Sequence, residues 1–359
     1  MVEAGGESRA NQPRAEVVKK VEVDGRKLVV LKASPLNKEA RKRAEGGESP
    51  APVLYIGGHN LRPKKVDDQV KTGFDIQELA DSISSDIYSI VRVSNGEGTD
   101  NARLAEREND PQGVSITNLH QAKADEIMQA IAILQKEEDR VLPALPLYLI
   151  GYSDGGIVAA LLLDAQPDLF DHFIIHNTPL ETVKTRKMYA RAIREGIHAF
   201  GHVLSPHEIL QRLKNDGASR EKITVQRSED DGYAESSYTS KPLVEKRAIA
   251  RTKSLLSLLP KILDTNKKLR GFIVNTQTDL FSPTDRVASE WAQVLQGVEA
   301  DERNEFGERV QIIDSEWESH IMGHKREART QKLGDIGGLM VRLRSQDASA
   351  GGPTVGLEA

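Results

Sequence analysis

Residues 146–163 constrain the fold more than any other part of the chain, because they combine a buried strand, a sharp turn and a buried helix. The apolar run Leu147–Ile150 is typical of a strand in a parallel sheet that is covered on both faces. Small residues come first after the turn and leucines follow, which predicts a helix packed closely on that strand. The succession of strand, tight turn and helix indicates an α/β chain.

The turn itself has the pattern Gly-x-Ser-x-Gly, from Gly151 to Gly155, with Ser153 at its centre. A serine hydroxyl becomes a nucleophile when a neighbouring base removes its proton, and a sharp turn at the end of a strand exposes it. The two glycines would let strand and helix approach closely, and the N–H of Asp154 could bind a developing oxyanion. The structural alternative is an ordinary turn in which Ser153 is the N-cap of a helix.

Length and composition bound the protein class. The chain has 359 residues, enough for one large α/β domain with an insertion or for two smaller domains. Charged residues make up 29% and hydrophobic residues 38%, which is typical of a soluble globular protein, and the net charge of −5 does not indicate a nucleic-acid partner. The absence of cysteine excludes disulfides, thiolate catalysis and cysteine metal sites.

The termini and the apolar runs bear on localisation. No apolar run approaches the ~20 residues of a membrane span, so we expect no integral membrane segment. The polar stretch Met1–Arg14 lacks the apolar centre of a secretory signal peptide. We therefore expect a disordered tail over 1–16 and a cytoplasmic protein, with export without a classical signal as the alternative. The Gly- and Ala-rich residues 345–359 predict a second flexible tail.

Alternating strand and helix patterns fill most of the chain and predict a doubly wound, mostly parallel sheet. An Asp24-Gly25 turn predicts a hairpin at the start of this sheet. The predicted strands after the hairpin cover residues 53–56, 87–93, 173–176, 269–275 and 310–313, and the predicted helices cover 75–85, 116–140, 283–295 and 327–344.

The exception is residues 179–266, where the sheet pattern stops and helical patterns replace it. We interpret this stretch as a helical cap inserted into a core made of 17–178 and 267–344. Basic residues such as Lys184 and Arg191 lie in its helical patterns. They indicate a solvated face, with attraction for an anionic substrate or membrane surface as the alternative.

The carboxyl ends of parallel strands meet at one edge of a sheet, and chemistry-bearing residues follow several of the predicted strands. Ser153, Asp279 and His320 do so, in the order nucleophile, acid and base. Asp285 competes with Asp279 but falls within the following helix, and His324 is the alternative base.

Two further strand ends matter for the same edge. Gly57-Gly58-His59-Asn60 follows the strand at 53–56, and its glycines would let a backbone N–H, that of His59, face the same oxyanion as the N–H of Asp154. A solvated surface turn is the alternative. His176 ends the strand at 173–176, where we expect a structural histidine; the alternative is that His176 and Asn177 point into the site.

These residues together resemble the α/β-hydrolase fold superfamily, over about residues 17–344. Gly151-Tyr152-Ser153-Asp154-Gly155-Gly156 is similar to its nucleophile elbow, and Thr278-Asp279 with Phe281 and Pro283 is similar to its acid loop. The resemblance implies Ser153 as nucleophile, Asp279 as acid, His320 as base and 179–266 as the variable cap. The loop at 57–60 lacks the family's frequent His-Gly pair, which leaves His59 and Asn60 open as the second oxyanion donor.

The chemistry predicted from these roles is that of a serine hydrolase, of the carboxylesterase or lipase type, acting on a small-molecule ester, thioester or amide. The alternatives are a non-catalytic ligand- or protein-binding module on the same fold and a secreted effector hydrolase. Neither histidine pair spaced by four residues, His320 with His324 or His198 with His202, lies in a His-Glu-x-x-His motif, so we expect no metal site. No phosphate-binding loop is present, so we expect no nucleotide cofactor; the oligomeric state cannot be read from this pattern.

Overall fold

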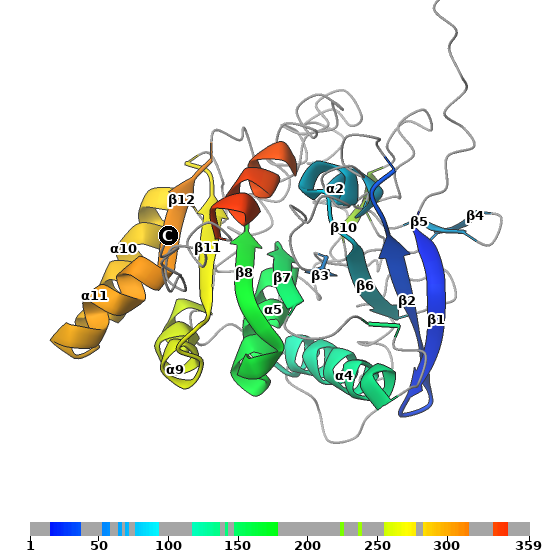
Figure 1. Cartoon of the computed structure of the whole chain (residues 1–359), viewed down its shortest axis with the longest axis horizontal. Helices are drawn as coiled ribbons and strands as arrows, with labels where there is room; N and C mark the ends of the chain where they lie inside the picture. Colours follow the sequence, from blue (N-terminus) through cyan, green and yellow to red (C-terminus); the bar gives the residue numbers. More distant parts are fainter. Residues whose placement is uncertain are drawn as a thin grey trace, which may run out of the picture.

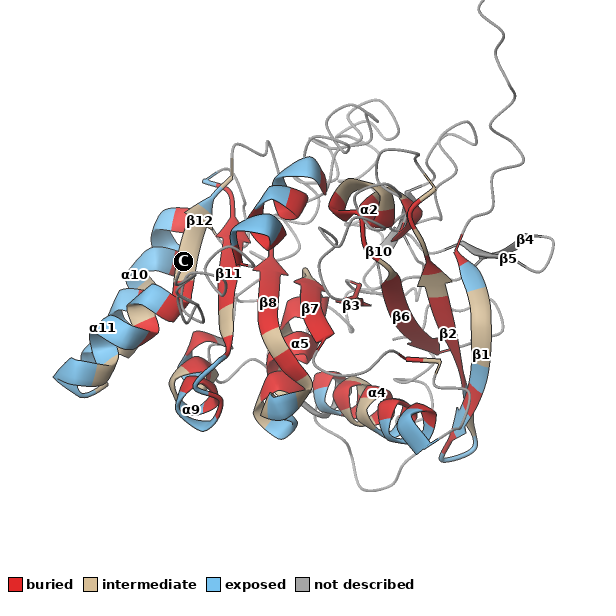
Figure 2. Ribbon diagram, viewed as in Figure 1, coloured by how far each residue is buried: buried red, intermediate tan, exposed pale blue. Residues whose placement is uncertain are grey.

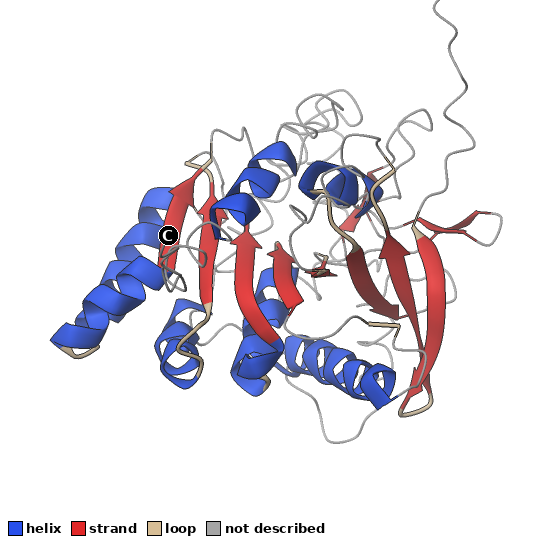
Figure 3. Cartoon of the chain, viewed as in Figure 1, coloured by secondary structure: helices blue, strands red, loops and turns tan. Residues whose placement is uncertain are grey.

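A central sheet with helices on both faces forms the body of the protein, as Figure 3 shows for the computed structural model. The structure describes residues 15–36, 52–57, 64–66, 69–71, 76–92, 117–136, 141–142, 147–178, 223–225, 236–238, 255–277, 283–315 and 333–343. Of the predicted tail over 1–16, residues 1–14 lie outside these ranges, as does the predicted tail over 345–359, so their disorder stays a prediction. Glu16, the last residue of the first predicted tail, is instead the first residue of a strand.

The large sheet has 8 strands in the order β1-β2-β6-β3-β7-β8-β11-β12 (Figure 1). From β6 to β12 every neighbouring pair is parallel, whereas β2 is antiparallel to both of its neighbours. The bounds are β1 Glu16–Val23, β2 Arg26–Ala33, β3 Val53–Ile56, β6 Ile87–Arg92, β7 Leu147–Tyr152, β8 Phe170–His176, β11 Arg270–Asn275 and β12 Val310–Asp314.

The N-terminal hairpin forms where the sequence predicts it. Asp24 and Gly25 both have positive φ, at 49° and 74°, as the tight turn between twisted strands requires. Val23 pairs with Arg26 across this turn, and β2 then joins the hairpin to β6. This antiparallel edge precedes the parallel strands, as in the α/β-hydrolase fold.

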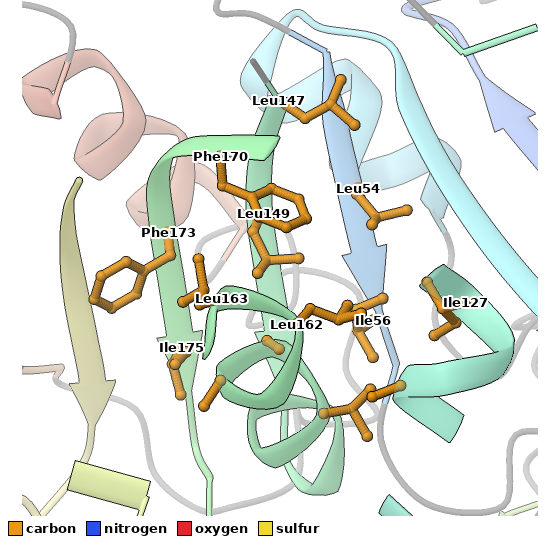
Figure 4. Close-up of a cluster of buried hydrophobic side chains, with 14 of the residues drawn as sticks. Leu54, Ile56, Ile127, Leu147, Leu149, Leu162, Leu163, Phe170, Phe173 and Ile175 are labelled. Carbon is orange, nitrogen blue, oxygen red and sulfur yellow. The ribbon is translucent and has the colours of Figure 1, made fainter. Parts of the chain in front are cut away.

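One face of the sheet packs on α4 (Thr117–Lys136), α5 (Asp154–Ala165), α9 (Leu259–Thr265) and α10 (Thr284–Gln296). Alternate strand residues such as Leu149, Phe173 and Ile175 belong to the buried cluster on this face, together with Leu162 and Leu163 of α5 (Figure 4). All these side chains are buried, and Figure 2 shows the central strands buried over most of their length. Their apolar area removed from water is the main favourable term in folding.

The opposite face packs on α2 (Ile76–Ile83) and on the helix over residues 333–343. Tyr148, Ile150 and Phe272 point to this side from the strands, and Ile336 and Met340 cover them from the C-terminal helix. Burial on both faces explains why the parallel strands are continuous apolar runs rather than alternating ones. Helices far apart in the chain thus complete the same layer.

The predicted cap is described only in part. Within 179–266 the structure describes an antiparallel pair, β9 (Ile223–Val225) with β10 (Ser236–Tyr238), and then the 3-10 turn η4 (Leu255–Leu258) and α9. Leu259, Ile262 and Leu263 of α9 are buried in the same core as the sheet strands. The C-terminal end of the insertion therefore packs on the core, while the cap as a whole stays a prediction.

A polar junction fixes the return of the chain into the sheet after α9. The Asn266 amide donates to the carbonyl oxygens of Pro167 at 2.7 Å and Phe170 at 2.9 Å. Arg309, the last residue of α11 (Ala300–Arg309), donates to the carbonyl oxygens of Leu263 and Asn266 at the end of α9. Burial lowers the pKa of Arg309, and the hydrogen bond to Glu305 opposes that shift. An arginine side chain nevertheless stays charged, and hydrogen bonds satisfy this buried guanidinium.

The strand order and directions are those of the α/β-hydrolase fold, so the predicted fold class is confirmed: a doubly wound, mostly parallel sheet with helices on both faces. Remaining helical or strand segments are β4 (Lys64–Val66), β5 (Gln69–Lys71) and the 3-10 turn η2 (Pro167–Leu169). In the described part of the chain, no helix has the length and apolar character to cross a bilayer.

Candidate active site

The sheet has a point where its connections change direction, between β3 and β7. The chain leaves β3 for β6 on one side, and it leaves β7 for β8 on the other side. In open α/β sheets, ligands bind in the crevice at the carboxyl ends of the strands at such a point. Gly57 follows β3 there and Ser153 follows β7, and their strands are in register through Ile56 and Gly151.

Ser153 has a backbone conformation that only a sharp turn imposes. Its φ is 52° and its ψ is −128°, between the last residue of β7 and the first residue of α5. A non-glycine residue in this region costs on the order of 1–3 kcal/mol and persists only where the surrounding structure fixes it. Ser153 occupies the N-cap position but its side chain makes no capping hydrogen bond to the helix, unlike the ordinary serine N-cap.

Close backbone packing explains the glycines on both sides of Ser153. A β-carbon at Gly155 would overlap the carbonyl oxygens of Ile56 and Gly57 at the end of β3. A β-carbon at Gly151 would lie 2.7 Å from the α-carbon of Gly156, inside any allowed contact. The pattern Gly-x-Ser-x-Gly is therefore required by the approach of α5 to β3 and β7, as the sequence predicts.

Helix α5 begins directly after Ser153, at the carboxyl end of β7. The Gly156 N–H donates to the Ser153 carbonyl oxygen at 2.9 Å and is thereby satisfied. Asp154 is the first residue of α5, and the first N–H groups of an α-helix have no partner within it. Its role as an oxyanion donor stays a prediction.

The neighbouring strand supports the turn. The Ser153 N–H donates to the His176 carbonyl oxygen at 3.0 Å, and the His176 ring lies 4.8 Å from the Tyr152 ring, centroid to centroid. His176 is fully buried on the sheet face, which favours the structural role that the sequence predicts for it. Asn177 follows with φ of 49° and Thr178 is fully buried beside Gly156.

A lysine contacts the end of β3. The Lys123 ammonium of α4 donates to the carbonyl oxygen of Gly57 at 3.3 Å. The same carbonyl packs against Gly155, so the start of the 57–60 loop is held between α4 and α5. Lys123 is a residue that the sequence analysis misses, because a half-buried lysine in an amphipathic helix normally indicates the boundary of a solvated face.

The remaining predicted site residues, His59, Asp279, His320 and the alternative base His324, lie outside the described residues. The structure does describe where their segments leave the sheet. Asp279 lies between Gln277, just after β11, and Pro283, just before α10, and His320 comes after Ser315, which follows β12. Their assignment as acid and base stays a prediction.

The described residues contain no candidate metal site. Among them, no three histidine, aspartate or glutamate side chains gather in a way that could hold an ion. The histidine pairs considered above lie outside the described ranges, so the expectation that the protein binds no metal stays a prediction.

No protein-family model matches the chain, and no curated protein matches it in sequence. Among solved structures it is similar to a membrane phospholipase A described as a novel bacterial virulence factor, with 14% identity over 91% of this chain and 86% of that one and a TM-score of 0.46. It is also similar to Est1E from Butyrivibrio proteoclasticus with bound ferulic acid, with 12% identity over 91% and 99% and a TM-score of 0.45. A third is E-2-(acetamidomethylene)succinate hydrolase, with 12% identity over 90% and 98% and a TM-score of 0.47.

Proposed function

We propose that the protein is a serine hydrolase of the carboxylesterase or lipase type, which cleaves a carboxylic ester, thioester or small amide through an acyl-enzyme on Ser153. The observation that carries this proposal is the conformation of Ser153. A strained, non-capping serine stands at the switch point of a doubly wound sheet, ahead of a helix N-terminus. Strain of this kind is retained where function needs it.

The proposed reaction begins when His320 removes the proton of the Ser153 hydroxyl as its oxygen attacks the substrate carbonyl carbon. Asp279 orients the imidazole and stabilises the imidazolium that forms. The N–H groups of Asp154 and His59 bind the oxyanion of the tetrahedral intermediate. His320 then protonates the leaving group, and water repeats the two steps on the acyl-enzyme to release the acid and restore Ser153.

The position of α5 supports the oxyanion role. Its first N–H group lies one residue after the nucleophile, so it is already in place when negative charge develops on the substrate oxygen. The helix dipole adds a partial positive charge at this end. One such donor typically lowers the barrier by about 3 kcal/mol.

The test is turnover of short acyl esters by the full chain and by Ser153→Ala, together with labelling by a fluorophosphonate probe. We expect loss of turnover by a factor on the order of 10³ or more, and loss of the label at residue 153 by mass spectrometry. Ser257→Ala, an exposed serine of η4, is the matched control and should keep both. Undiminished turnover by Ser153→Ala would contradict the proposal.

A second pair of variants separates the two candidate bases. His320→Ala should lose turnover to a similar extent as Ser153→Ala, because without a base the hydroxyl stays protonated. His324→Ala should retain most of it. The reverse result would transfer the role of base to His324 and leave the reaction class unchanged.

A further inference from the structure

The two segments that carry Asp279 and His320 leave the sheet from adjacent strands, and hydrogen bonds connect their ends. β11 and β12 are parallel neighbours, with Asn275 opposite Asp314 at their carboxyl ends. The first segment runs from Thr276 to the start of α10, and the second starts at Ser315. Contacts between these ends set where both segments begin.

The first connection extends the ladder past the end of β12. The Ser315 N–H donates to the Asn275 carbonyl oxygen at 2.8 Å, and the Ser315 hydroxyl donates to the same oxygen at 3.0 Å. Asn275 is fully buried and Thr276 nearly so. The Asn275 carbonyl oxygen, just before the segment that carries Asp279 (the acid segment), therefore accepts both hydrogen bonds from Ser315, where the segment that carries His320 begins.

The second connection joins the far end of the acid segment to the same place. The Thr284 hydroxyl, at the first residue of α10, donates to the Asp314 carboxylate at 2.7 Å. A hydroxyl that donates to a carboxylate makes a charge-assisted bond, about twice as strong as a neutral one. The carboxylate also lies at the N-terminus of α10, where the helix dipole favours negative charge.

The acid segment is thus held at both ends against one short stretch, Asp314 and Ser315. Thr284 is buried while Asp314 is exposed, so the bond lies at the surface of the core and contributes little to packing. The N–H of Asp285 also donates to the Gln277 side-chain oxygen at 3.5 Å, so the residues on either side of 278–282 are in contact. These contacts restrict the separation of the two segment ends.

From these contacts we infer that Thr284 and Ser315 are positioning residues for the proposed acid–base pair: they fix, relative to each other, the points from which the segments of Asp279 and His320 leave the described structure. The inference rests on the proposed function. It differs from a purely structural role because the displacement of a catalytic group by about 1 Å costs up to about 100-fold in rate.

The experiment compares Thr284→Val, Asp314→Ala and Ser315→Ala with the matched control Thr265→Val. The control removes the exposed Thr265 hydroxyl, which donates to the Lys261 carbonyl oxygen at 2.9 Å in the last turn of α9. We expect the first variants to lower kcat by on the order of 10-fold with an unchanged KM, and Thr284→Ser to restore it. The control should match the parent protein.

A pH profile separates positioning from general damage. A nearby carboxylate raises the pKa of an imidazole, so weaker contact between Asp279 and His320 should shift the acid limb of kcat/KM to lower pH. Thermal unfolding of each variant checks that it folds, and Asp314→Ala removes only an exposed side chain should Thr284→Val prove unstable.

The outcomes distinguish the positioning role of Thr284 and Ser315 from the proposed function. Loss of turnover in Ser153→Ala, with Thr284→Val, Asp314→Ala and Ser315→Ala (the clamp variants) indistinguishable from Thr265→Val, would overturn the inference and leave the proposed function standing. Undiminished turnover in Ser153→Ala would overturn both. A lower kcat in the clamp variants without a shift of the acid limb, and with a lower unfolding temperature, would reduce Thr284 and Ser315 to structural residues.

Discussion

The backbone N–H of Ser153 donates a hydrogen bond of 3.0 Å to the carbonyl oxygen of His176, one residue beyond the end of β7. The bond extends the ladder between β7 and β8 to the turn, so the neighbouring strand fixes the position of the serine. This bond would help to preorganise Ser153 for its proposed role as nucleophile.

Replacement of Ser153 should reveal the backbone strain. We expect Ser153→Gly to unfold at a higher denaturant concentration than Ser153→Ala, by about 1 kcal/mol in free energy of unfolding, because glycine accepts the φ of 52° and alanine does not. The greater freedom of glycine in the unfolded chain opposes part of this gain. Equal stability of the two variants would show that the turn is relaxed.

The approach of α5 to β3 predicts a large penalty for a single methyl group at Gly155. A β-carbon there meets backbone atoms of Ile56 and Gly57, which cannot rotate away, so we expect Gly155→Ala to lose about 1–3 kcal/mol of stability and most of its activity. Gly338→Ala is the control, since its β-carbon meets nothing within 4 Å. It should be neutral or slightly stabilising in chemical unfolding.

The contact of Lys123 with Gly57 gives a prediction for the proposed oxyanion loop at 57–60. Lys123→Met keeps the length of the side chain but removes the donor to the Gly57 carbonyl, so the loop at 57–60 loses one restraint. We expect kcat to fall by a few-fold to about 10-fold with little change in KM, and Lys123→Arg to recover part of it. Lys136→Met, exposed in the last turn of α4, should have no effect.

The amino-terminal edge of β6 predicts a loss of stability at alkaline pH. Lys32 contacts Asp86 at 2.9 Å and lies 5.6 Å from the centre of the Tyr88 ring. Burial alone would lower the pKa of Lys32, but the hydrogen bond and charge of Asp86 outweigh it and raise that pKa. Burial also raises the pKa of Tyr88, against the charge of Lys32.

Both groups therefore hold their protons more tightly in the folded protein, and their contribution to stability is present below about pH 10 and lost as pH rises further. We expect the free energy of unfolding to fall as the pH rises above about 10, and Lys32→Met to reduce that fall by less than about 1 kcal/mol. Lys27→Met, exposed on the same strand, is the control. A fall of equal size in both variants would contradict the assignment.

Strong local signals make most of the sheet predictable from the sequence. The apolar runs of β3, β7 and β11 and the Asp24-Gly25 turn each specify one local structure, and the structure confirms them. β8 starts at Phe170 rather than at the predicted 173, because His172 interrupts the apolar run. Its ring stacks on Tyr148 at 4.6 Å, a contact that local sequence cannot show.

Elements that bury little apolar surface were harder to predict. Helix α11 buries only Phe306 and Arg309, so it lacks an apolar stripe, and the sequence analysis missed it. β9 and β10 have three residues each, and they pair with each other although they are separated in the sequence, so neither forms a recognisable pattern on its own. The connections at Thr284 and Ser315 depend on side-chain partners brought together by the strand order, which no single stretch of sequence encodes.

The fastening of Asn266 by Pro167, Phe170 and Arg309 has a practical consequence for engineering. The stretch between residues 178 and 255 departs from one anchored point of the body and returns at another, and both anchors are built from the body itself. Foreign sequence grafted between them should leave the sheet and its serine turn intact. Such grafts would test whether this stretch sets the substrate preference of the proposed hydrolase.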